Sequence, residues 1–216
     1  MKLKEFSLWG FKLPLEESRE FTLFNRSICA HFERHFEAFD TKGVYRVIIK
    51  LSEPDERVNT IEESSSVLKF YKAFDFDELS SLDRQAKKER LLNVLYHSLL
   101  ELCEKLSWPS KPFKQAYDAV YQDKFVNIYE FKKKNSRNRK LIAKLECHHG
   151  TESFDCYVKV EDKSGSEILK KLVFSSEPDE FIFNSLLGNL KWVDDETLSI
   201  LRKNRSEIER VRLDLK

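Results

Sequence analysis

The sequence predicts an α+β fold, with mainly antiparallel strands in two groups and one long central helix plus a shorter helix packed on them. Apolar residues alternate in several segments before residue 76 and after residue 126, which is typical of half-buried strands. Between these groups, leucines recur at steps of three and four, which is typical of a helix. We expect one domain over 1–216, with a two-lobed alternative of strands 1–76, helices 78–123 and a meander 126–216.

The N-terminal elements are read from the alternation of apolar residues. Residues 3–24 favour two strands interrupted at Pro14. The apolar residues of 28–39 fit a helix and a strand equally well. The turn Asp40-Thr41-Lys42-Gly43 then leads into a β-branched strand over 44–51, which favours a hairpin. A helix before the turn remains the alternative.

The middle of the chain is predicted to be helical. The acid-rich segment 52–66 favours a loop, and 67–74 resumes strand character. Leu92, Leu95, Leu99 and Leu102 then predict a helix over about 81–106, capped near Ser80. Pro112 is expected to start a shorter helix that continues to Tyr121.

The C-terminal part reads as a meander. We expect strands over 126–133, 141–147, 154–160 and 168–174, a short helix from Pro178, a hairpin over 190–201 and a last strand over 208–215. Matching the apolar faces of 141–147 and 154–160 predicts a hairpin with Cys147 opposite Cys156.

Composition excludes several classes of protein. The 38 Lys+Arg nearly balance 37 Asp+Glu, so no global field attracts nucleic acid or an anionic membrane. Only five glycines are present, which argues against phosphate-cradling loops. The N-terminus has charges where a signal peptide needs an apolar stretch, and the four cysteines form no C-x-x-C pair. We therefore expect a soluble cytoplasmic protein without a cofactor.

Catalytic and metal-binding patterns are weak. His31 and His35 would share a face of a helix and could hold zinc with Cys29 or Cys147-His148-His149, but no paired cysteine spacing supports this and Glu33 does not directly follow His31. We predict no metal, with His31 and His35 as the weaker alternative. Acid pairs such as Asp75/Asp77 and Asp194/Asp195 are predicted to be caps and turn residues rather than catalytic groups.

Two charged segments are candidate binding surfaces. An acidic loop could dock against a basic partner protein. A basic turn with Tyr129 and Phe131 just before it could neutralise phosphates, and it is the alternative. The acidic residues are Glu53, Asp55, Glu56, Glu62 and Glu63; the basic residues are Lys132, Lys133, Lys134, Arg137, Arg139 and Lys140.

In size, richness in charge, cytoplasmic character and lack of a catalytic signature, the chain resembles small bacterial immunity proteins, which neutralise partner toxins. This resemblance rests on general features and implies a non-enzymatic inhibitor that binds another protein, such as a toxin or effector. A nucleic-acid-associated protein that uses the basic turn is the second interpretation. An enzyme with a dispersed site is the third.

Overall fold

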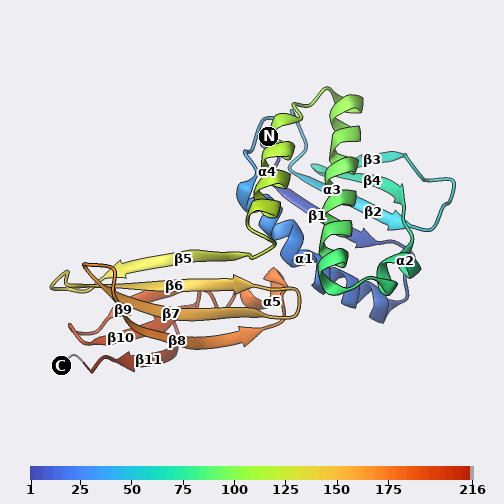
Figure 1. The fold of residues 1–216 in the computed structure, drawn as a ribbon. Helices are drawn as coiled ribbons and strands as arrows, with labels where there is room; N and C mark the ends of the chain where they lie inside the picture. The colour runs from blue at the N-terminus through green and yellow to red at the C-terminus, as the bar shows by residue number, and fades with distance from the viewer. Residues whose placement is uncertain (215–216) are drawn as a thin grey trace. The chain divides into compact units, whose positions relative to one another are not determined.

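The computed structural model describes residues 1–214 and confirms the α+β class. Within this range there are five helices and eleven strands, and six of the eight strand pairs are antiparallel. Contacts divide the chain into two compact units, Met1–Val126 and the part from Asn127 onward (Figure 1). Each unit has its own hydrophobic core, so each is described by itself below.

Unit 1, the part up to Val126, contains a four-stranded sheet in the order β1-β2-β4-β3. Its strands are β1 (Glu5–Gly10), β2 (Arg46–Ser52), β3 (Ile61–Ser64) and β4 (Val67–Ala73). β1 and β4 each run parallel to β2, and β3 pairs antiparallel with β4 at the edge. The predicted strands 44–51 and 67–74 are therefore present, and the predicted loop 52–66 contains the short strand β3.

The helix α1 (Leu15–His35) corrects the N-terminal prediction. The second predicted strand within 3–24 and the hairpin over 28–39 are both wrong, and the helical alternative for 28–39 holds as far as His35. Parallel strands cannot be joined by a tight turn, so the chain between β1 and β2 must cross over, and a helix is the usual crossover. Phe21, Ile28 and Phe32 form the buried stripe of this helix.

The remaining helices of unit 1 are α2 (Phe76–Ser81), α3 (Arg84–Leu106) and α4 (Lys111–Gln122). The long predicted helix is confirmed, although its cap is Asp83, whose carboxylate accepts the N–H of Ala86 at 2.9 Å. Helices α1, α3 and α4 contact one another beside the sheet (Figure 1). Phe6 on β1 makes edge-on ring contacts with Phe32 at 5.3 Å and Phe113 at 6.0 Å, which join β1, α1 and α4 in one core.

Unit 2, the part from Asn127 onward, is built from two antiparallel sheets. One has the order β5-β6-β7-β8, and the other has the order β11-β10-β9. Apolar residues of both sheets form one core, as in a β-sandwich. The elements are β5 (Ile128–Asn135), β6 (Leu141–His149), β7 (Phe154–Asp162), β8 (Glu167–Ser176), α5 (Glu180–Phe183), β9 (Asn189–Trp192), β10 (Thr197–Leu201) and β11 (Glu207–Arg212).

The predicted meander is confirmed in unit 2, including its register. Cys147 lies opposite Cys156, and both thiols are free and buried. The predicted last strand, 208–215, corresponds to β11, and its end at Leu215 lies outside the described residues. Across residues 1–214, no helix combines the length and the apolar character that crossing a membrane requires.

The close approach of the backbone to Gly188 allows a test of the packing of unit 2. A Cβ placed on this residue would lie 2.2 Å from the carbonyl oxygen of Leu201 and 2.3 Å from that of Arg202. We expect Gly188→Ala to lower the free energy of unfolding by about 1–3 kcal/mol, the usual range for overpacking. Urea denaturation measures this change in the free energy of unfolding.

The matched control is Gly165→Asn, because Gly165 has a φ of 85° with open space around its Cβ position, and asparagine tolerates a left-handed backbone. We expect this control to change the free energy of unfolding by less than about 0.5 kcal/mol. Equal effects of the two substitutions would contradict the close approach at Gly188.

Candidate functional site

The acidic loop divides into residues with internal partners and residues without them. The carboxylate of Asp55 lies 2.7 Å from Lys12 Nζ and accepts the N–H of Arg57, and these bonds lower the pKa of Asp55. Glu62 accepts the hydroxyl of Tyr71 at 3.0 Å. Within residues 1–214, Glu53, Glu56 and Glu63 are exposed and form no ion pair. Only these last three are therefore available to a partner.

An aromatic and cationic row crosses the sheet of unit 1 on the face opposite its core. The strand register aligns Trp9, Lys50 and Tyr71 on β1, β2 and β4. The Nζ atom of Lys50 lies 3.3 Å from the centre of the Trp9 ring, and burial lowers the pKa of Lys50. The Trp9 side chain nevertheless remains 45% exposed. A large aromatic surface is thus held in place by a cation and still faces solvent.

Phe11 and Arg57 connect this row to the acidic loop. The ring of Phe11 packs edge-on against Tyr71 at 5.5 Å, and the Arg57 guanidinium lies 5.1 Å from the centre of the Phe11 ring. We call the surface formed by Trp9, Phe11, Tyr71 and loop residues 53–57 the aromatic–acidic face. Glu63 lies opposite the buried Leu68 in the strand register and therefore points to the other side of the sheet. The sequence contains one signal for the aromatic–acidic face, because Trp9 is out of phase with the buried Phe6 and Leu8.

A cavity of about 460 Å³ adjoins the acidic loop where β2 and β4 end. Glu53, Asp75 and Arg90 line it. Asp75 caps α2 by accepting the N–H of Glu78, and Arg90 lies 3.0 Å from Glu78. The acid at the start of α2 is therefore a cap, as predicted.

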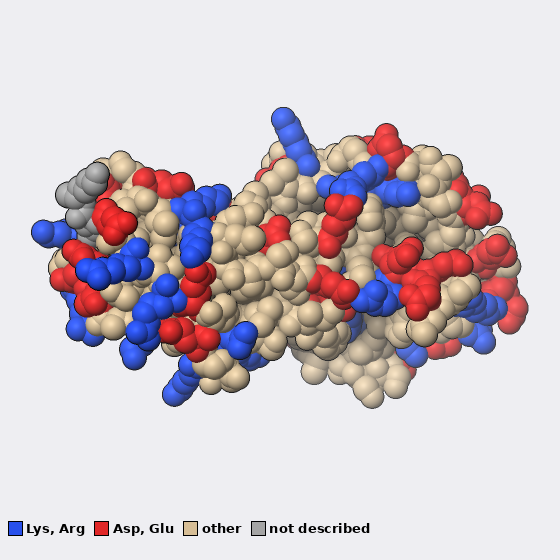
Figure 2. All heavy atoms as spheres, turned by 90° about the horizontal axis from the view of Figure 1, so that it is seen from below, with Lys and Arg blue, Asp and Glu red and all other residues tan. Residues whose placement is uncertain are grey.

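The predicted basic turn covers the end of β5, which carries Lys132, Lys133 and Lys134, and the turn that leads to β6, and it is partly engaged within unit 2. Lys132 donates to the side chain of Asn189 at 2.6 Å, and Lys133 lies 3.6 Å from Glu130. The N–H of Asn138 donates to Asp195, so an acidic turn lies beside the basic one. Figure 2 shows basic and acidic side chains interspersed on the face in view. Four of the predicted cations form neither an ion pair nor a side-chain hydrogen bond within residues 1–214: Lys134, Arg137, Arg139 and Lys140.

Four lysines lie opposite one another across the large sheet of unit 2. The register pairs Lys133 with Lys144, Lys144 with Lys159, and Lys159 with Lys170. Like charges directly opposite each other destabilise a sheet. This lysine row therefore needs carboxylates on both sides of it.

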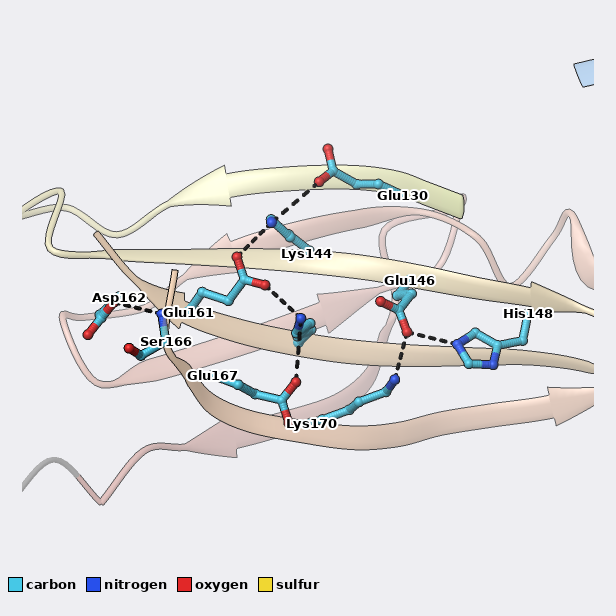
Figure 3. Close-up of polar contacts among 10 residues, drawn as sticks. Glu130, Lys144, Glu146, His148, Glu161, Asp162, Ser166, Glu167 and Lys170 are labelled. Atoms are coloured by element: carbon cyan, nitrogen blue, oxygen red, sulfur yellow. Dashed lines mark hydrogen bonds and ion pairs between the residues drawn. The ribbon is translucent and has the colours of Figure 1, made fainter. Parts of the chain in front are cut away.

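Glutamates on the neighbouring cross-strand rows supply these carboxylates (Figure 3). Lys144 Nζ lies 2.6 Å from Glu161 and 3.9 Å from Glu130, and Lys159 lies 2.8 Å from Glu161. The two lysines lower the pKa of Glu161. Each cation of the row has a nearby carboxylate, which makes the row a structural feature rather than a site for phosphate.

Glu146 completes the network and holds one of the histidines. His148 Nε2 lies 2.8 Å from Glu146 and Lys170 lies 2.7 Å from it (Figure 3). These hydrogen bonds lower the pKa of Glu146. His148 is therefore a partner of a surface carboxylate and does not meet a second imidazole.

His31 and His35 are brought together with a residue that sequence reasoning missed. They share one face of α1, and the Nε2 atoms lie 3.0 Å and 2.9 Å from the same oxygen of Asp123, at the end of α4. Cys29 does not join them, since its thiol faces the Asn25 side chain at 3.7 Å. An aspartate after a helix is too common a feature to have indicated this contact.

Burial and hydrogen bonding set the charges in this cluster. The His31 side chain is 3% exposed, and its burial lowers its pKa. The hydrogen bond from His31 lowers the pKa of Asp123. A carboxylate only accepts hydrogen bonds, so both rings donate an N–H to it.

Two of the four buried thiols, those of Cys103 and Cys156, are protected rather than reactive. Burial raises the pKa of Cys103 to about 11, and the hydrogen bond to Cys147 together with burial raises that of Cys156. A thiolate is the reactive form of cysteine, so burial keeps Cys103 and Cys156 in the unreactive thiol form.

The lysine row generates a prediction about acid stability. The lowered pKa of Glu161 implies a stabilisation that is complete above its ordinary pKa of about 4.5 and is lost as the pH falls through the lowered value. Lys144→Met removes part of the cause. We expect the variant to be less stable than the wild type near neutral pH and equally stable near about pH 2, measured by urea denaturation across the pH range.

Lys163→Met is the control, because Lys163 is exposed and forms no ion pair within residues 1–214. It should match the wild type at every pH. A constant difference for Lys144→Met across the whole range would rule out the ionic explanation.

Comparison with known proteins gives no further guide to this chain. A scan against protein-family models, a search of curated proteins and a search of solved structures each found no match.

Proposed function

We propose that this protein is a non-enzymatic cytoplasmic binding protein that associates with another protein and inhibits it, in the manner of an immunity protein. The observation that carries the proposal is the aromatic–acidic face, where exposed Trp9 lies on the same face as the acidic loop. Desolvated aromatic residues dominate the energy of protein interfaces, and charges at the rim mainly affect the rate of association and specificity. Both components are present on one surface.

The chemistry of the face indicates a partner with a basic surface. Glu53 and Glu56 on this face, and Glu63 at the neighbouring edge of the sheet, are exposed and have no internal cation, so their charge is available for steering. Trp9 is held by Lys50, so little side-chain freedom is lost when it is covered. We propose that Trp9 anchors the complex and that the three glutamates accelerate its formation.

Nucleic acid binding through the basic turn remains the second candidate. Lys134, Arg137, Arg139 and Lys140 favour it, because they lack carboxylate partners within residues 1–214. The adjacent acidic turn at Asp195 weakens the local potential. We therefore favour the protein partner.

Photo-crosslinking in the native cell tests the proposal. A benzophenone side chain at position 9 should crosslink one protein, whereas the same group at position 181 should not. Phe181 is a good reference because it is 90% exposed and belongs to unit 2. Crosslinking of position 9 to nucleic acid, or equal crosslinking from both positions, would contradict the proposal.

Binding measurements with the crosslinked partner then separate the two components. Trp9→Ala should weaken binding at least ~30-fold, which corresponds to the ~2 kcal/mol of an interface hot spot. Replacing Glu53, Glu56 and Glu63 by lysine should slow association and reduce its salt dependence. Stopped-flow kinetics and titration calorimetry measure these effects.

The paired substitution Arg137→Glu and Arg139→Glu is the matched control, because it alters an exposed charged turn elsewhere in the chain. It should leave the complex unchanged. Loss of binding in this control with normal binding by Trp9→Ala would favour the nucleic-acid interpretation or a different interface.

A further inference from the structure

We propose that His31, His35 and Asp123 form a binding site for one zinc ion. This site is separate from the aromatic–acidic face and does not depend on the proposed function. The three groups present two imidazole nitrogens and a carboxylate oxygen, which is a ligand set that zinc accepts. Their ligand atoms all lie within 4.8 Å of one another.

The spacing is close to the spacing that a zinc ion requires. Zinc bonds to nitrogen and oxygen are about 2.0–2.2 Å long, which places neighbouring ligands of a tetrahedron about 3.3 Å apart. The Nε2 atoms of His31 and His35 lie 3.0 Å and 2.9 Å from Asp123 Oδ2. These two separations would widen by a few tenths of an ångström to admit the ion, and the two Nε2 atoms, which lie within 4.8 Å of each other, would settle about 3.3 Å apart. Each ring would then bind through Nε2, with its proton moved to Nδ1.

The surroundings are closed on one side and open on the other. The His31 side chain is 3% exposed and is fixed within unit 1, whereas those of His35 and Asp123 are 31% and 44% exposed. An ion can therefore enter from solvent, and water can take the fourth position. The imidazole pair favours zinc over calcium or magnesium, which prefer oxygen ligands.

The nearest candidate for a general base is already engaged. Glu33 lies between the two histidines in sequence, but its carboxylate accepts the N–H of Phe6 at 2.7 Å and lies 2.6 Å from Arg26. The site thus lacks the glutamate that zinc proteases use. We infer that zinc would link α1 to the end of α4 and would not drive a reaction.

Calorimetry with the full chain, purified without a histidine tag and freed of metal, tests this site. Zinc chloride should bind with a stoichiometry of one per chain. His35→Gln and Asp123→Asn each remove a ligand of the ion. Removal of an outer partner of a metal ligand already costs up to ~100-fold in affinity, so each of these changes should reduce the affinity at least ~100-fold. Zinc should raise the melting temperature of the wild type and not of these variants.

His148→Gln is the matched control, since His148 is also a histidine beside a carboxylate but, within residues 1–214, belongs to no group of three potential metal ligands. It should bind zinc as the wild type does. Circular dichroism without metal shows whether each variant is folded. Absence of zinc uptake by the wild type, undiminished binding by folded His35→Gln and Asp123→Asn, or loss of binding in His148→Gln would each overturn the proposal.

Discussion

The parallel pairing of β1 with β2 is the constraint on which the rest of unit 1 depends. Two parallel neighbours need a crossover connection, and α1 provides it over 21 residues. Because this helix lies against β1 on the core side, residues such as Phe6 are buried between them, and Trp9, one step out of phase, is left on the opposite face. The division of the sheet into a core face and an opposite face that carries Trp9 therefore follows from the crossover.

The same crossover creates the histidine cluster. His31 and His35 are four residues apart, which places the two imidazoles one turn apart on the same face of a helix, whereas a strand would hold them about 13 Å apart. α1 then packs beside α4, whose end carries Asp123. A hairpin over 28–39 would lack this helix–helix packing and would not bring the two histidines to Asp123.

In unit 2 the main constraint is the repulsion between like charges on one face of the large sheet. Opposed lysines on β5, β6, β7 and β8 would repel one another, and the glutamates on the adjacent rows offset this repulsion. Individual surface ion pairs contribute little to the free energy of folding. The network therefore fixes the strand register and makes stability depend on pH more than it raises overall stability. The sandwich core, which includes Cys147 and Cys156, supplies most of the stability.

The success of sequence reasoning followed the strength of the local pattern. Strict alternation predicted β6 and β7 and the register that places Cys147 opposite Cys156. The leucine spacing predicted α3. The segment 28–39 fitted two periodicities, and the turn at Asp40 was misleading because Asp40 pairs instead with the N-terminus of the chain. The contact of Asp123 with the two histidines depends on long-range packing, which no local pattern encodes.

Nuclear Overhauser contacts measured by NMR test the central claim most directly, because both candidate sites require α1 and the parallel pairing of β1 with β2. We predict contacts between the backbones of Leu8 and Ile49, together with helical contacts three residues apart that continue through His31 to His35. Strand-type contacts throughout 28–39, with this segment paired antiparallel to β2, would contradict the account.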